Sequence, residues 1–187
     1  MNNIAGAIIT FSRPQYYGKV LRSLENCENS NKIPWHVFQD GYKDLPKDDY
    51  GYKEVSEENI NRNIQLTNNS KLNVVSHNIN EYNRGVNFAF NSVTMLFGLG
   101  YDTIFIFEDD LIVSKYYLNL LYQCSIEYPD IVASFHSVRI QLNRNPKILA
   151  KCPAARLWGF YLTRTVWNLI ENDWINFYIC GFTLTLY

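Results

Sequence analysis

The strongest structural signal in this sequence is the stretch Thr103-Ile104-Phe105-Ile106-Phe107-Glu108-Asp109-Asp110-Leu111. Its β-branched and aromatic side chains form a continuous apolar run, and the turn signal Leu99-Gly100-Tyr101-Asp102 precedes it. A run of this kind is typical of a strand that is buried on both faces, as in a parallel sheet. The stretch therefore predicts a central strand of an α/β fold that leads directly into three carboxylates.

Three adjacent carboxylates repel one another, so we expect a compensating charge, and Mn²⁺ or Mg²⁺ is the simplest candidate because both prefer oxygen ligands. In an extended chain alternate side chains share a face, which would place Glu108 and Asp110 on one side and Asp109 on the other. We therefore expect one direct metal ligand, with the other two acids contacting hydroxyl groups or water. The alternative interpretation is that Asp109 and Asp110 only begin a turn or cap the next helix.

The composition limits the class of protein. A chain of 187 residues with 47% hydrophobic residues suits one domain, residues 1–187. The net charge of −1 and the lack of a Lys/Arg cluster argue against a nucleic-acid binder. The four cysteines and three histidines show no metal-ligand spacing, so we expect reduced thiols and no zinc site. No leader-like or membrane-spanning run is present, and we expect a cytoplasmic protein, soluble or loosely peripheral to the membrane.

The amino-terminal part predicts the opening of a parallel α/β sheet. Residues 4–11 form a first buried strand, and Ser12-Arg13-Pro14-Gln15 has the pattern of a capping box with Pro in the first turn of a helix. Residues 35–39 predict a second strand, which the turn dipeptide Asp40-Gly41 closes. The helix between them has an apolar face with a 3.6-residue period, made of Tyr17, Val20, Leu21 and Leu24.

The remaining elements are expected from similar signals. An exposed helix should run from Ser56 to Thr67, and a helix from about Asn87 should end at Gly98 as its C-cap. After the acids, Ser114 should cap a helix over 115–128, and Thr163 should cap a last short helix to about Asn172. Further strands are expected at 72–75, 131–135 and 157–162.

Polar residues also follow the first two strands. Arg13 lies at the start of a helix, where the helix N-terminus and a bidentate guanidinium both favour phosphate. Asp40 could accept from a base imide or a ribose hydroxyl. Each residue alone is more often capping or solvated, but parallel strands would bring both to the edge that carries the three acids, where such sheets bind ligands. No G-x-G-x-x-G, P-loop or G-x-S-x-G motif is present.

Four segments together carry a resemblance to a known family: Ile8–Arg13, Val37–Gly41, Ile106–Leu111 and Trp158–Leu162. In this order they resemble the nucleotide-sugar-dependent glycosyltransferases of the GT-A fold, most closely the N-acetylglucosaminyltransferase I type, over about residues 4–174. The resemblance implies a three-layer α/β/α sandwich with a mostly parallel central sheet. Residues 1–112 would be a nucleotide-binding half, and residues 113–187 would be an acceptor-side half.

The resemblance also implies an activity, which is the inverting, metal-dependent transfer of a sugar from a nucleotide diphosphate, a UDP-sugar, to a hydroxyl group of a glycan or another acceptor. A base would remove the proton of that hydroxyl group. By this resemblance, Arg13 would contact the phosphate or the base of the nucleotide, Asp40 would hydrogen-bond the uracil, and Arg84 would approach the nucleotide. Glu108 and Asp109 would contact the ribose and the donor sugar. Asp110 would bind Mn²⁺ (or Mg²⁺).

The sequence departs from the family at the catalytic base, the group that would take the proton of the acceptor hydroxyl. Relatives carry an Asp a few residues beyond a Trp that matches Trp174, whereas here no carboxylate follows Asp173. Truncation is our first explanation; the acceptor-side half is then incomplete, and apolar surface near 174–187 could drive self-association. A second explanation is that Asp173 serves as the base, and a third is that the domain binds the nucleotide sugar with little transfer. Two rival hypotheses are a nucleotidyltransferase that uses the same acids and a structural α/β domain without a ligand.

Overall fold

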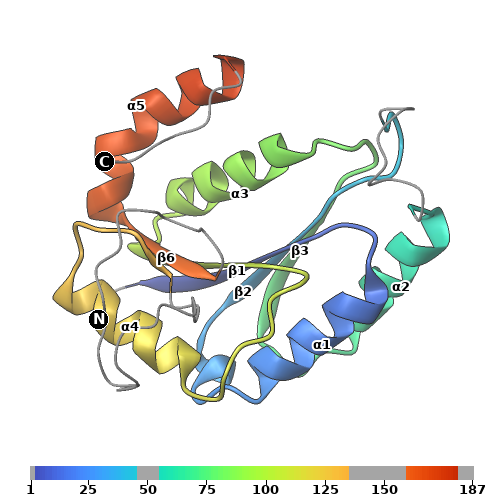
Figure 1. Cartoon of the computed structure of the whole chain (residues 1–187), viewed down its shortest axis with the longest axis horizontal. Coiled ribbons are helices and arrows are strands. Elements are labelled where there is room, and N and C mark those ends of the chain that lie inside the picture. Colours follow the sequence, from blue (N-terminus) through green and yellow to red (C-terminus); the bar gives the residue numbers. More distant parts are fainter. Residues whose placement is uncertain (1–2, 46–54, 135–158, 181–187) are drawn as a thin grey trace, which may run out of the picture.

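The computed structural model of this chain describes residues 3–45, 55–134 and 159–180 (Figure 1). A six-stranded sheet with the order β3-β2-β1-β4-β6-β5 lies at its centre. The strands β1 (Ile4–Thr10), β2 (Trp35–Gln39), β3 (Val74–Ile79) and β4 (Thr103–Glu108) are parallel. Only β6 (Phe160–Thr163) runs against its neighbours β4 and β5 (Ala133–Ser134). The mostly parallel central sheet is therefore confirmed.

Helices cover both faces of the sheet. The helices α1 (Pro14–Glu25), α2 (Glu57–Asn68) and α4 (Tyr117–Glu127) lie on one side. The helices α3 (Val86–Gly98) and α5 (Arg164–Cys180) lie on the other side (Figure 1). This arrangement confirms the predicted three-layer sandwich. Among the described helices, none combines the length and the apolar character that crossing a bilayer requires.

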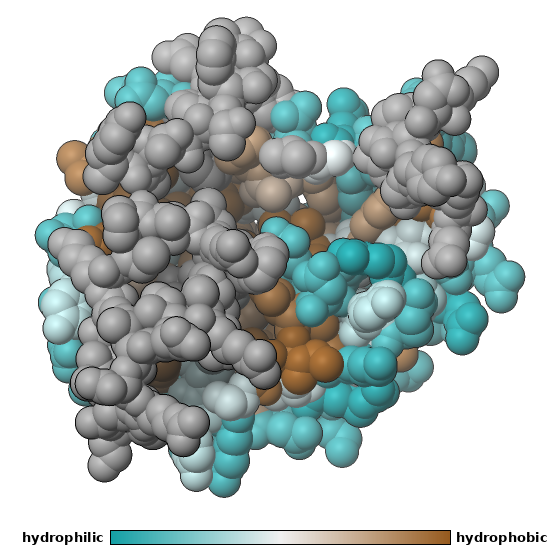
Figure 2. Space-filling model, in the orientation of Figure 1, coloured by the Kyte–Doolittle hydropathy of each residue, from teal (hydrophilic) through white to brown (hydrophobic). Residues whose placement is uncertain are grey.

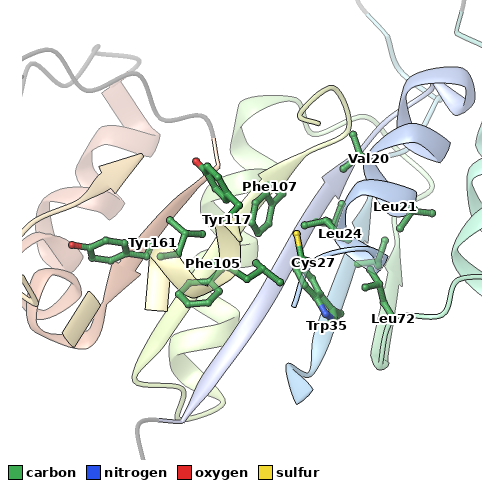
Figure 3. Close-up of a cluster of buried hydrophobic side chains, with 14 of the residues drawn as sticks. Val20, Leu21, Leu24, Cys27, Trp35, Leu72, Phe105, Phe107, Tyr117 and Tyr161 are labelled. Carbon is green, nitrogen blue, oxygen red and sulfur yellow. The ribbon is translucent and has the colours of Figure 1, made fainter. Parts of the chain in front are cut away.

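The core consists of two clusters, one on each face of the sheet, and β4 contributes to both because its side chains alternate. Phe105 and Phe107 pack beneath α1 and α4, and Figure 3 shows Phe107 beside Tyr117. Ile104 and Ile106 pack against α3 and α5. The apolar run thus lies buried on both faces, as its sequence predicts, and its end fixes the position of the following acids.

The core also explains one glycine of β1. A Cβ atom at Gly6 would overlap the indole ring of Trp35, which is fully buried beside it. Glycine is therefore required here because the ring of Trp35 occupies the space that any other side chain would need.

Two predicted helix N-caps are wrong. The helix α1 begins at Pro14 with Arg13 as its N-cap, and the hydroxyl of Ser12 accepts instead from the backbone N–H of Ser56, at 3.4 Å. The helix α4 begins at Tyr117, because Tyr117 N–H bonds to the carbonyl of Ser114 in a preceding turn, and no side chain caps it. The Thr163 cap is confirmed, since its hydroxyl accepts from Val166 N–H at 3.2 Å.

Several boundaries also differ from the predictions. The strand β3 pairs with β2 over Val74–Ile79 rather than over 72–75, because Leu72 packs into the core ahead of the strand. Gly98 is the last residue of α3 and Leu99 is its C-cap. The last helix is longer than expected and reaches Cys180. Only 133–134 of the strand expected at 131–135 is a strand; residue 135 and residues 157–158 lie outside the described part of the chain.

Candidate functional site

The parallel strands β1, β2 and β4 end at the same edge of the sheet. Arg13 follows β1, and Glu108, Asp109 and Asp110 end or follow β4. We call these four residues the acidic rim. The structure brings them together, as the sequence predicts for a parallel sheet.

Asp109 is the buried member of the acidic rim, with 2% of its surface exposed, whereas Glu108 and Asp110 are exposed. Its Oδ2 accepts from the hydroxyl of Thr10 at 3.2 Å and from the N–H of Phe11 at 3.0 Å. Its Oδ1 accepts from Nη2 of Arg13. Both oxygens of Asp109 are therefore engaged by groups of the protein, and the carboxylate ties the end of β4 to the end of β1.

Arg13 bridges two acids. Besides its contact with Asp109, its Nη1 donates to Oδ2 of Asp110 at 3.2 Å. Burial lowers the pKa of the Arg13 guanidinium, but the charges and hydrogen bonds of Asp109 and Asp110 outweigh this effect, so the pKa is raised. The Arg13 side chain remains partly exposed, at 44%, so that a ligand in solution can still reach it.

The clustered acids change the pKa of Glu108. The protein atoms around its carboxyl raise its pKa by desolvation even though part of the side chain stays exposed, and the charges of Asp110 and Asp109 raise it further. The positive charge of Arg13 opposes this shift only in part. The field at the acidic rim thus favours a cation.

The donor set of the acidic rim can accommodate Mn²⁺ or Mg²⁺ through Asp110. Carboxylate oxygens suit these ions, and the Asp110 side chain is 40% exposed. Within the described ranges, no group of three or more His, Cys, Asp or Glu side chains is placed to hold a metal ion. A cation here would therefore take one carboxylate from the protein and further oxygens from a bound phosphate, which is a common arrangement for Mg²⁺. Exposed and buried acids alternate along residues 108–110, and the division into one metal ligand and two other acids stays a prediction.

Asp40 follows β2 at the same edge and is buried, with 5% exposure. Its carboxylate accepts from the backbone N–H groups of Gly41, Arg84 and Gly85 at 2.9–3.2 Å. Nδ2 of Asn83 donates to it as well, at 3.0 Å. Asp40 therefore fixes the turn ahead of α3, and its contact with a uracil base stays a prediction.

The other two predicted site residues differ in their placement. Arg84 is joined to Asp40 through its backbone, and its side chain is exposed. Asp173 is exposed on α5, which begins at the opposite edge of the sheet, because Arg164 N–H bonds to the carbonyl of Asp102 just ahead of β4. No hydrogen bond or ion pair joins Asp173 to the acidic rim in the described part of the chain, and its role as a base stays a prediction.

Sequence reasoning missed two buried polar residues beside the acidic rim, Thr10 and Asn63. Nδ2 of Asn63 donates to Oγ1 of Thr10 at 2.9 Å and to the carbonyl of Phe11 at 3.0 Å. The signal that could have found Asn63 was helical spacing, because it lies three residues after Ile60 and four before Thr67, on the buried face of a helix that is exposed elsewhere.

The surface near the acidic rim is mixed in character. Hydrophilic residues dominate the surface over α1 and α2, and apolar residues are exposed beside them (Figure 2). Ile112 and Tyr116, which follow the acids, are 68% and 60% exposed. Two grooves, of about 330 Å³ between α1 and α2 and about 410 Å³ on α4, are lined by other residues.

No protein-family model and no curated protein sequence matches this chain. Solved structures do match its fold. S. aureus TarS superposes with a TM-score of 0.57 at 14% identity, over 92% of this chain and 30% of TarS. The galactosyltransferase LgtC, in complex with donor and acceptor sugar analogues, superposes with a TM-score of 0.51 at 11% identity, over 96% of this chain and 66% of LgtC. This chain thus spans less than a third of TarS and about two thirds of LgtC. The likeness shows a GT-A-like glycosyltransferase fold.

Proposed function

We propose that this chain is a metal-dependent glycosyltransferase that moves a sugar from a nucleotide diphosphate donor, a UDP-sugar, to an acceptor hydroxyl with inversion. One observation carries the proposal: Nη1 of Arg13 lies 3.2 Å from Oδ2 of Asp110 at the carboxyl edge of the parallel strands. An arginine is a common ligand of phosphate groups, and an aspartate is a common ligand of metal ions. The GT-A-like fold supports it, since LgtC, which shares that fold, is named as a galactosyltransferase with donor and acceptor analogues bound.

In this proposal each residue of the acidic rim has a separate role. Mn²⁺ (or Mg²⁺) held by Asp110 would stabilise the diphosphate as a leaving group. Arg13 would donate to the phosphate oxygens from the start of α1. Glu108 would accept from a ribose or donor-sugar hydroxyl, and Asp109 would act by holding Arg13 in place. Asp40 and Arg84 would face the nucleotide from the turn ahead of α3.

The transfer itself needs a base. The acceptor oxygen would attack the anomeric carbon, the bond to the diphosphate oxygen would break with its electron pair leaving on that oxygen, and the hydroxyl proton would pass to the base. Asp173 is the candidate on this chain. Because no carboxylate follows Asp173 in the sequence, a second candidate function is a domain that binds the nucleotide sugar and transfers it poorly.

The finer assignment follows the resemblance to the N-acetylglucosaminyltransferase I type. It favours Mn²⁺ as the ion, an N-acetylhexosamine or a hexose as the transferred sugar, and a glycan as the acceptor. A nucleotidyltransferase would use the same acids but would release pyrophosphate rather than UDP, so the released product separates the two reactions.

The test is to incubate the protein with Mn²⁺ and a panel of UDP-sugars and to measure released UDP and thermal stability. A donor present at 100 times its dissociation constant should stabilise the protein by about 2.7 kcal/mol. Stabilisation with slow UDP release supports a transferase, and stabilisation without release supports the binding domain. No stabilisation by any UDP-sugar of the panel contradicts the proposal, and so does release of pyrophosphate when UTP replaces the UDP-sugars.

A further inference from the structure

Asn63 stands out among the polar residues of this chain because it is completely buried on a helix that is otherwise largely exposed. Its amide reaches from α2 to the end of β1, where Nδ2 donates both to Oγ1 of Thr10 and to the carbonyl of Phe11. Both of these residues in turn donate to Oδ2 of Asp109. The amide of Asn63 is therefore one hydrogen bond removed from the buried carboxylate of the acidic rim.

The contact with Thr10 fixes the direction of a proton. A hydroxyl group has one hydrogen and two acceptor lone pairs. Since Oγ1 of Thr10 accepts from Asn63, its own hydrogen is free to point at Asp109, 3.2 Å away. Without the amide, the hydroxyl could turn toward another acceptor, and Asp109 would lose one of its three donors.

The opposite end of the same amide argues against a purely stabilising role. Oδ1 of Asn63 is buried and has no hydrogen-bond partner among the described residues. A buried acceptor of this kind destabilises the folded state, and an apolar residue of the same size, such as leucine, would avoid that cost. The residue is better explained by what its Nδ2 group does for the Thr10 hydroxyl and the Phe11 carbonyl.

We propose that Asn63 is a positioning residue of the acidic rim: through Thr10 and Phe11 its amide fixes the Asp109 carboxylate, which holds the guanidinium of Arg13 against Asp109 and Asp110. The consequence for donor binding rests on the proposed function, whereas the effect on Arg13 does not. The helix α2, which contributes no residue of the acidic rim, thereby sets the orientation of its guanidinium.

A structural role and a positioning role predict different effects of the same substitutions. Asn63→Leu removes the amide donor, and Thr10→Val removes the hydroxyl; both keep about the size of the original side chain. Thr10→Ser keeps the hydroxyl and removes only a methyl group. Thr67→Val is the matched control, because Thr67 is buried one turn along α2 and its hydroxyl contacts Tyr17 and the main chain of Asn63 instead. Any loss of stability common to all buried hydroxyl variants is therefore measured separately.

The direct readout is ¹⁵N NMR of the Arg13 guanidinium, assigned by its disappearance in Arg13→Lys. In the unchanged protein and in Thr67→Val, rotation of the guanidinium should be slow, because both Nη groups are held by acids. Asn63→Leu and Thr10→Val should accelerate the rotation severalfold, and Thr10→Ser should return it toward the original rate. Slow rotation in Asn63→Leu and Thr10→Val, both folded, would overturn the proposal.

The second readout is the affinity for UDP with Mn²⁺. Asn63→Leu should weaken binding by about tenfold, the factor expected when one hydrogen bond to a charged network is lost. In an Arg13→Ala background the same substitution should have no further effect, because it acts through Arg13. An equal loss of UDP affinity in the unchanged protein and in the Arg13→Ala background would contradict a positioning role for Asn63. If the unchanged protein binds no UDP, the proposed function fails, and the guanidinium rotation still decides the role of Asn63.

Discussion

The guanidinium of Arg13 and the carboxylate of Asp109, 96 positions apart in the chain, form an ion pair that joins the start of α1 to the end of β4. The two partners differ in environment, with Asp109 almost fully buried and Arg13 about half exposed. Arg13 thus neutralises a buried charge with one face of its guanidinium and keeps another part in solvent.

Replacing Arg13 with alanine should destabilise the protein by about 1.5–3 kcal/mol, because the buried carboxylate of Asp109 loses a charged hydrogen-bond partner. Urea unfolding followed by circular dichroism measures this change. Arg22→Ala is the control, since Arg22 is exposed on the same helix, and it should change the free energy of unfolding by no more than about 0.5 kcal/mol. Equal effects of the two substitutions would show that the ion pair has no net value.

Asp40→Asn should loosen the turn ahead of α3. A carboxylate accepts from all four of its donors, whereas an amide has one oxygen and turns its own N–H groups toward some of them. Hydrogen exchange at the amides of Arg84 and Gly85 should accelerate by at least tenfold. Asp44→Asn, at an exposed position with φ of 58°, provides a control that should leave this exchange unchanged.

Glu108→Gln should make the free protein more stable at neutral pH. The pKa of Glu108 is raised from 4.5 in the folded state, so the folded protein binds this proton more tightly than the unfolded chain does. The stability that this group contributes therefore falls as the pH rises from about 4.5 through the raised pKa. Thermal melts at pH 3.5 and pH 7 should show a higher Tm for the variant only at pH 7, and a higher Tm at both values would exclude titration as the cause.

Two histidines, the buried His36 and the partly buried His77, should make the fold sensitive to acid. Burial lowers the pKa of His36 and of His77 below 6.5, so the unfolded chain takes up these protons first and stability falls as the pH decreases through 6.5. Each group can contribute at most about 1.4 kcal/mol per pH unit. The double variant His36→Gln, His77→Gln should show a flatter fall between pH 6.5 and 5 in urea titrations. An unchanged slope would assign the acid sensitivity to other groups.

The sequence predicted the sheet and the place of the acids because both depend on local signals that the fold respects. The apolar run of β4 can only be buried on both faces, and the polar residues after β1, β2 and β4 must then meet at one edge. Helix caps were harder to predict, because Ser12 had the right spacing but its hydroxyl bonds to Ser56, a partner distant in the chain.

The same limit applies to the contacts inside the acidic rim. Nothing local to Asp40 indicates that its oxygens accept from residues 83–85. The link from Asn63 through Thr10 to Asp109 joins three separate segments and becomes visible only when β1, β4 and α2 have packed together. The segment 135–158, which carries Trp158 of the family resemblance, and the side chains of 174–187, to which the predicted self-association is assigned, lie outside the described residues.

The central claim is that Asp110 binds a cation that in turn binds the diphosphate of the donor. Calorimetric titration of UDP into the protein, with and without Mn²⁺, tests this claim most directly. Binding should require Mn²⁺ and should weaken at least tenfold in Asp110→Asn, whereas Asp130→Asn, an exposed acid ahead of β5, should bind as the unchanged protein does. Binding that persists in Asp110→Asn, or that is the same without the metal ion, would contradict the account.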